Sequence, residues 1–173
     1  MSVLDIRILG DPILREACEP VETFDEELRT LVRDMRETMY EADGIGLAAP
    51  QVGVPLRVFV YDVRVGEVAQ GVLVNPVIEA RSGTMKSEEG CLSIPGISEV
   101  LERAERVVVT GLDVDGEPVR IEAEGRLGVC LQHETDHLDG VLFLDRLSPL
   151  KRKMALNRWS KSQAEDAVSS GAL

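Results

Sequence analysis

The sequence has no long apolar run, few cysteines and few cations, and each shortage excludes a class of protein. No apolar segment approaches the ~20 residues that a helix needs to cross a bilayer, so we expect no membrane association. The first residues, Met1 to Asp5, lack the basic region and apolar stretch of a secretory signal. Three cysteines are an odd number and too few for a disulfide scaffold. We therefore expect a cytoplasmic protein with reduced thiols.

Cations are outnumbered by acids, 19 to 31, and the net charge is −12. This balance argues against a general nucleic-acid binder, DNA included, because phosphate contacts need clustered Lys and Arg. Residues 151–161 differ from this acidic balance, because they contain five cations and no acid: Lys151, Arg152, Lys153, Arg158 and Lys161. A basic helix there could dock on RNA or an acidic surface, and a solvated helix face is the simpler interpretation.

Length and periodicity predict one domain of α+β class over residues 1–173. Apolar residues at helical spacing predict a helix over residues 25–42, and Thr23 with Glu26 forms a possible capping box at its start. Further helices are expected at 127–138 and, as a basic C-terminal helix, at about 148–165. Strand patterns occupy the middle of the chain, at 56–63, 71–80, 106–113 and 119–124, with the last two joined in a hairpin through Asp115-Gly116.

The second predicted helix contains His133-Glu134-Thr135-Asp136-His137, which matches the pattern H-E-x-x-H. Residues four apart lie one turn apart on one helix face, so the two imidazoles can converge on a single ion. Glu134 can then act on water as a general acid/base without binding the metal. A chance match on an amphipathic helix is the alternative interpretation, and the helical context argues against it.

A catalytic site of this kind usually has a third protein ligand. The long metzincin pattern would place a histidine six residues after His137, where this chain has Phe143, so that interpretation fails. A downstream carboxylate remains formally possible, with Glu165 or Asp166 as candidates, but both lie in the polar tail.

A cysteine is the better candidate for the third ligand. Cys91 lies in a glycine-rich stretch, residues 88–96, of the kind found at a strand edge, where backbone can approach a ligand closely. Cys130 is the rival, one turn before His133, but its apolar neighbours favour a buried thiol. Cys18 lies near the N-terminus, with no other ligand type in its motif, and is interpreted as structural.

Three segments together resemble the peptide deformylase family, whose members remove the formyl group from the formyl-methionine of newly made chains. They are Gly44-Ile45-Gly46-Leu47-Ala48-Ala49-Pro50-Gln51, Glu89-Gly90-Cys91-Leu92-Ser93 and Gln132-His133-Glu134-Thr135-Asp136-His137-Leu138, in the family's order. The resemblance covers residues 9–150. It implies small antiparallel sheets packed around a central metal-binding helix, with N-terminal and C-terminal helices.

Carried over to this chain, the resemblance makes Cys91, His133 and His137 the ligands of one divalent ion, Fe²⁺ in the cell, with Zn²⁺ or other divalent ions possible. Glu134 becomes the acid/base, and the catalytic group gains Gln51, the N–H of Leu92, and Gly46. The candidates for the methionine pocket are Gly44, Ile45, Val129 and Cys130, together with His133. The basic tail resembles the helix with which some family members contact the ribosome.

Two positions depart from the expected family pattern. Arg126 occupies the start of the third-motif helix, where it could alter the pocket rim. Arg103 follows Glu102 rather than proline, and it is expected to pair with Glu89 behind Cys91. A small metallopeptidase of the same H-E-x-x-H chemistry and a non-catalytic metal-binding module remain the competing interpretations.

Overall fold

The computed structural model describes residues 2–64 and 69–169, and these residues form an α+β fold, the class expected from the sequence. The predicted domain of residues 1–173 extends beyond the described part at both ends. The elements in chain order are η1 (Pro12–Arg15), α1 (Glu26–Glu41), β1 (Gly46–Ala48), η2 (Ala49–Val52), β2 (Val58–Asp62), β3 (Gln70–Ser82), β4 (Met85–Cys91), β5 (Ile94–Arg103), β6 (Arg106–Leu112), β7 (Pro118–Glu124), α2 (Gly125–Leu138), η3 (Phe143–Arg146) and α3 (Pro149–Ser169).

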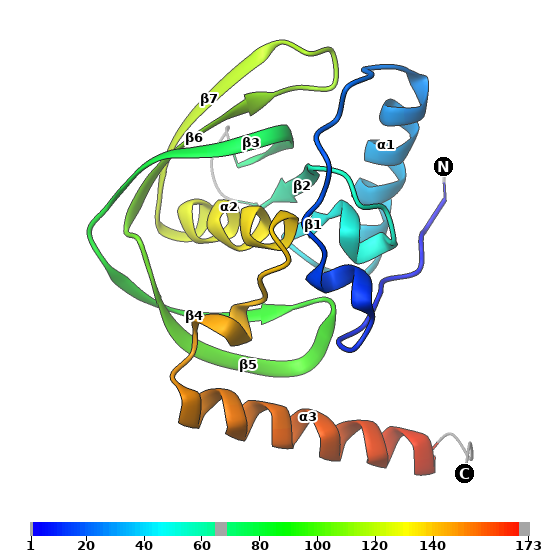
Figure 1. Ribbon diagram of the computed structural model, residues 1–173, viewed down its shortest axis with the longest axis vertical. Coiled ribbons are helices and arrows are strands. Elements are labelled where there is room, and N and C mark those ends of the chain that lie inside the picture. The colour runs from blue at the N-terminus through cyan, green and yellow to red at the C-terminus, as the bar shows by residue number, and fades with distance from the viewer. Residues whose placement is uncertain (1, 65–68, 170–173) are drawn as a thin grey trace.

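Two antiparallel sheets surround α2, as Figure 1 shows. One has the strand order β1-β2-β3-β6-β7, and the other consists of β4 and β5. Ser82 of β3 pairs with Arg106 of β6, and Met85 of β4 pairs with Arg103 of β5. The two strand pairs are therefore consecutive parts of one ribbon, which bends between the sheets. Because of this bend, β4 and β5 lie on one side of α2 and the central strands of the larger sheet, β2 and β3, on the other (Figure 1).

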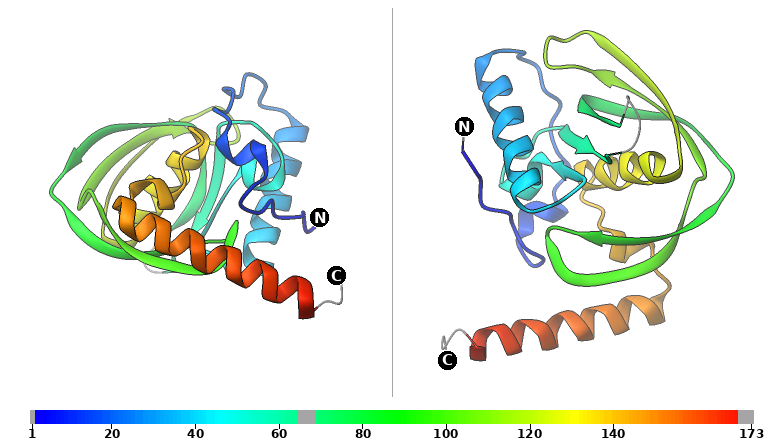
Figure 2. Two further views of the ribbon diagram at one scale, coloured as in Figure 1. Left: turned by 60° about the horizontal axis from the view of Figure 1, so that its bottom comes forward. Right: turned by 180° about the vertical axis from the view of Figure 1, so that it is seen from behind.

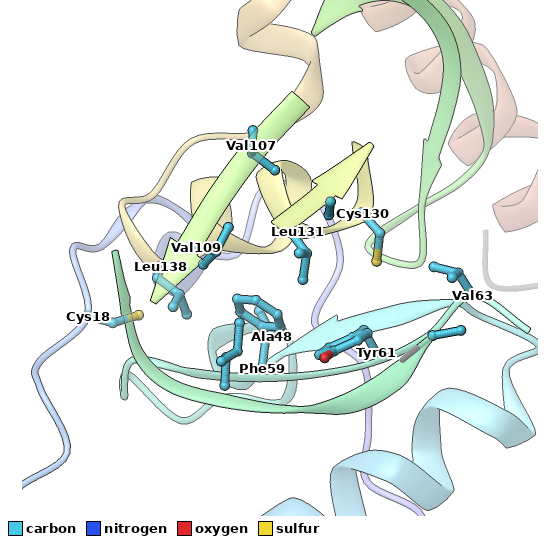
Figure 3. Close-up of a cluster of buried hydrophobic side chains, with 13 residues drawn as sticks. Cys18, Ala48, Phe59, Tyr61, Val63, Val107, Val109, Cys130, Leu131 and Leu138 are labelled. Atoms are coloured by element: carbon cyan, nitrogen blue, oxygen red, sulfur yellow. The ribbon is translucent and has the colours of Figure 1, made fainter. Parts of the chain in front are cut away.

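The core around α2 is apolar and closely packed, which holds this helix inside the curved sheet. Leu131 and Leu138 of α2 are fully buried. They share one cluster with Phe59 and Tyr61 of β2 and with Val109 of β6, and Figure 3 shows these side chains meeting between helix and sheet. Alternating inward side chains on the strands thus meet the apolar stripe of the helix. The opposite stripe of α2 is left for polar groups.

The N-terminal helix α1 packs on β1 and β2, and its bounds agree with the predicted helix to one residue. Its start differs from the prediction, because Asp25 is the N-cap and its side chain accepts a hydrogen bond from the N–H of Leu28. The capping box of Thr23 with Glu26 was therefore wrong. Aspartate is as good a cap as threonine, and it lies directly before the first helical turn.

The C-terminal helix α3 lies along the outside of β5, and Figure 2 shows its length beyond that strand. It runs from Pro149 to Ser169, longer than the predicted 148–165. Trp159 and Ala155 are buried against a cluster that includes Ile97 and Leu101 of β5. Over the two described ranges, no helix combines the length and the apolar character needed to span a membrane.

Candidate metal centre and active site

Helix α2 brings His133, Glu134 and His137 to its polar face, where they meet β1 and residues of β4. The imidazole rings of His133 and His137 are edge-to-face with centroids 5.0 Å apart. This is the arrangement that the spacing of four residues predicts for one turn of helix. His137 and Glu134 are almost completely buried.

Cys91 reaches this face from the end of β4. The pairing of β4 with β5 shifts register between Gly90 and Cys91, so that Cys91 lies opposite Ile94 at the tight end of the ribbon. Its Sγ is 3.4 Å from Nε2 of His137. The candidate ligand atoms of Cys91, His133 and His137 all lie within 4.8 Å of one another. The structure thus brings together the three residues that the resemblance makes ligands.

The other two cysteines lie apart from this group. Cys18 and Cys130 belong to the buried cluster between α2 and the larger sheet, and burial raises the pKa of both thiols. The Sγ of Cys130 points to the carbonyl of Ile45 at 3.6 Å. Cys130 therefore behaves as the buried thiol that its apolar neighbours indicated.

The donor set fits a transition metal. Thiolate and imidazole suit zinc and ferrous iron, and a neutral imidazole is the form that binds them. Burial lowers the pKa of His137 well below its usual range, which keeps that ring neutral. Burial also opposes charge on His133, but hydrogen bonds with Cys91 and Glu89 raise its pKa well above the usual range. Cys91 and Glu89, which stabilise a proton on His133, are also suited to stabilise a metal cation bound at that ring.

A buried ion network holds His133 from behind. Nδ1 of His133 lies 2.9 Å from Oε1 of Glu89. Arg103 donates to both carboxylate oxygens of Glu89 at 2.7 Å, so the predicted pairing of these two residues is confirmed. Burial would raise the pKa of Glu89, but the bonds from Arg103 and His133 outweigh it and lower the value to about 2. Glu89 is thus a fixed anion, and it orients His133 as carboxylates commonly orient ligating histidines.

Glu134 is 2% exposed, and burial raises its pKa to about 7. A carboxyl with a pKa near neutrality can both accept and return a proton at the pH of the cell. Gly46 of β1 lies directly against it, because a Cβ built on Gly46 would be 2.6 Å from Oε2 of Glu134. The place that the resemblance gives Gly46 in the catalytic group has a steric counterpart, since only glycine leaves this space to the carboxylate.

Gln51 of η2 lies beside the thiol of Cys91. Its Oε1 accepts a hydrogen bond from the N–H of Ala48, which fixes the orientation of the amide. Its Nε2 then donates to Oγ of Ser93 at 3.1 Å and to Sγ of Cys91 at 3.5 Å. Sequence reasoning gave Ser93 no role, although it lies in the second motif. No local pattern connects it with Gln51, which is 42 residues away in the chain. Leu92, between Cys91 and Ser93, packs its side chain against Gly44.

A cavity of about 860 Å³ opens beside these groups. Its wall includes the four predicted pocket residues Gly44, Ile45, Val129 and Cys130, and also Arg126. Sequence reasoning missed the contribution of β4 and β5, because it predicted no strand there. Besides Glu89 and Cys91, their residues in the wall are Met85, Lys86, Ser87, Glu88, Gly90, Ile94, Pro95, Gly96, Ile97 and Ser98.

Fold and site together define a class of protein: an α+β metal-dependent hydrolase with an H-E-x-x-H helix. Comparison with known proteins narrows this class. Residues 3–153 match the family model described as polypeptide deformylase. A peptide deformylase of Alkalilimnicola ehrlichii is 51% identical over 172 residues, which are 99% of this chain and 97% of that protein. One from Acidothermus cellulolyticus is 54% identical, over 90% of this chain and 85% of that protein.

Solved structures agree with the sequences. The crystal structure of a peptide deformylase from Legionella pneumophila is 50% identical and superposes with a TM-score of 0.90, over 96% of this chain and 98% of that one. The chain therefore belongs to the polypeptide deformylase family. It is an enzyme that removes the formyl group from the N-terminus of newly made polypeptides and releases formate. The metallopeptidase and binding-module interpretations are set aside.

Proposed function

We propose that Cys91, His133 and His137 bind one divalent metal ion, which is Fe²⁺ in the cell. The proposal is supported by the close approach of the three ligand atoms and by the fixed carboxylate of Glu89 behind one of them. Zn²⁺ and other divalent ions suit the same thiolate and imidazole donors. An ion held there supplies Lewis-acid activation of water and of the formyl carbonyl. Metal analysis of native protein and of His133→Ala tests the assignment, and equal metal content in both would contradict it.

Glu134 is the proposed general acid/base. Its carboxylate lines the cavity, is excluded from bulk water and is held against Gly46. It accepts the proton of the attacking water and returns it to the amine that leaves, so that one residue serves both halves of the reaction. The amine remains on the shortened peptide, and the formyl carbon departs as formate.

Gln51 and the backbone N–H of Leu92 are the proposed donors to the oxygen that becomes negative as water adds to the carbonyl. The amide of Gln51 is oriented by Ala48, and the hydrogen that its Nε2 directs at Sγ of Cys91 is the one available to meet that charge. Such preorganised donors are worth more in a water-excluded site than in solution.

The methionine side chain is proposed to occupy the part of the cavity bounded by Ile45, Val129 and Cys130, near Gly44. These residues come from the segment around β1 and from α2, so the apolar wall adjoins His133. Arg126 lies at the start of α2 in the same wall and places a cation beside it. A methionine in this position would bring its formyl group to the side of Glu134.

We propose that the basic segment of α3 contacts the ribosome, and that the chain works in the cytoplasm as one catalytic domain. Lys153 and Lys161 are exposed on this helix, where they can approach RNA phosphates. Sedimentation with ribosomes tests the contact by comparing native protein with the double variant Lys153→Glu/Lys161→Glu. The variant Arg81→Glu/Arg106→Glu makes the same change of charge on β3 and β6, and equal loss of binding in both would contradict a contact through α3.

A further inference from the structure

The ion network behind His133 does not end at Arg103. Arg103 uses its third hydrogen bond, from Nη1, to reach Oδ2 of Asp136 at 2.7 Å. Asp136 also lies in the H-E-x-x-H segment, but it points away from the metal ligands into this network. Arg103 is therefore shared between two buried carboxylates, Glu89 on one side and Asp136 on the other.

Asp136 has a second cationic partner, which comes from outside α2. Arg146, the last residue of η3, approaches Oδ2 with Nε at 3.2 Å and Oδ1 with Nη2 at 2.8 Å. Its side chain is 47% exposed, whereas that of Arg103 is 4% exposed. Arg146 is thus the end of the network that faces solvent. The same turn also begins with Phe143, whose ring stacks on His133 with centroids 6.2 Å apart.

Charges alternate along this network, from Glu89 through Arg103 and Asp136 to Arg146. Loss of the terminal cation would leave one buried arginine between two carboxylates that compete for it. Arg103 would then bind Glu89 less firmly. The ring of His133 would in turn be oriented less firmly, because Glu89 is the partner of its Nδ1. Arg146 prevents this, because its guanidinium donates two hydrogen bonds to Asp136, which then competes less for Arg103.

We propose that Arg146 is a positioning residue of the metal site, acting through Asp136 on the buried Arg103. The inference rests on the proposed ligand set of Cys91, His133 and His137. Arg146 touches neither the cavity nor the candidate ligands, so its effect is on how firmly the metal is held. Carboxylate partners of ligating histidines typically change metal affinity 10- to 100-fold when removed. Arg146 lies three contacts beyond Glu89, so a smaller loss of about fivefold to tenfold is expected.

The experiment measures release of Co²⁺ from loaded protein into excess chelator, followed by the visible absorption of the thiolate-bound ion. Arg146→Met is expected to release the metal about five to ten times faster than native protein. Arg146→Lys should release it at an intermediate rate, because lysine keeps the charge but cannot donate two parallel hydrogen bonds to Asp136. Arg15→Met is the matched control. Arg15 is also a half-exposed arginine that pairs with η3, but with Asp145 instead of Asp136, and it should release metal at the native rate.

A double-mutant cycle tests the route of the effect. In an Asp136→Asn background, Arg146→Met should add less than a twofold change, because the two residues act in series. Release from Arg146→Met at the native rate, or equally fast release from Arg15→Met, would overturn the inference. Those results leave the ligand set intact, whereas native protein that fails to bind Co²⁺, or His133→Ala that binds it equally well, would overturn both. Urea unfolding of the metal-free variants checks that each is folded.

Discussion

Gly46→Ala is predicted to disable the enzyme through a single methyl group. A Cβ at this position would lie 2.6 Å from Oε2 and 2.9 Å from the carboxyl carbon of Glu134. Non-bonded carbon atoms pack at about 3.5 Å or more, so the carboxylate must move by roughly half an ångström to one ångström. Displacement of a catalytic group by about 1 Å can cost about 100-fold in rate, or roughly 2.7 kcal/mol of transition-state stabilisation. The fall should be in kcat/KM, with metal content unchanged.

The assay is formate release from a short formyl-methionyl peptide by protein loaded with ferrous iron under anaerobic conditions. Gly90→Ala is the control, because Gly90 lines the same cavity but a Cβ there meets nothing closer than 3.5 Å. We expect that control to stay within a few-fold of native activity. Native-like kcat/KM in Gly46→Ala, within about threefold, would refute the claim that glycine is needed to make room for Glu134.

Three further predictions concern the same framework. Gln51→Ala should lower kcat by about 10²-fold to 10³-fold with metal retained, measured by steady-state kinetics, because it removes an oriented donor to the developing charge. Arg103→Met should destabilise the fold by about 3–5 kcal/mol in urea unfolding, since Glu89 and Asp136 lose their shared buried partner; a change below 1 kcal/mol would contradict the buried network. Trp159→Ala should cost about 3–5 kcal/mol by opening a cavity between α3 and β5, and full stability in thermal unfolding would show that this packing contributes little.

Local patterns were sufficient where one face of an element meets the core. The apolar spacing of α1 predicted its bounds to one residue, and the hairpin of β6 and β7 followed from alternation around Asp115-Gly116. The H-E-x-x-H spacing likewise predicted which side of α2 carries the two imidazoles. In each case the signal lies within a few residues, so no tertiary information is needed.

The strands β4 and β5 were not predicted, for a physical reason. In β5 the buried apolar residues are Ile94, Ile97 and Leu101, spaced by three and four rather than two. In β4 all residues contribute to the cavity wall, and most of them are polar or glycine. Their pairing also contains a register shift next to Cys91. A twisted strand pair that forms a cavity wall therefore lacks the alternation by which strands are recognised.

The support of the site also depends on contacts between distant segments. Arg146 and Phe143 reach the network and His133 from η3, and Ser93 reaches Gln51 from the turn between β4 and β5. Nothing in the local pattern around Arg146 or Phe143 indicates such a role. The pairing of Arg103 with Glu89 could be anticipated from the family resemblance, but its continuation to Asp136 appears only when the chain is folded.

The most direct test of the central claim compares formate release by native protein and Glu134→Gln, both loaded with ferrous iron and both checked for metal content. The account predicts rapid release by native protein and a loss of at least about 10²-fold in the variant, because glutamine cannot transfer the proton in either direction. Equal metal content would assign that loss to proton transfer. Comparable release by the two proteins would contradict the role of Glu134, and with it the proposed mechanism.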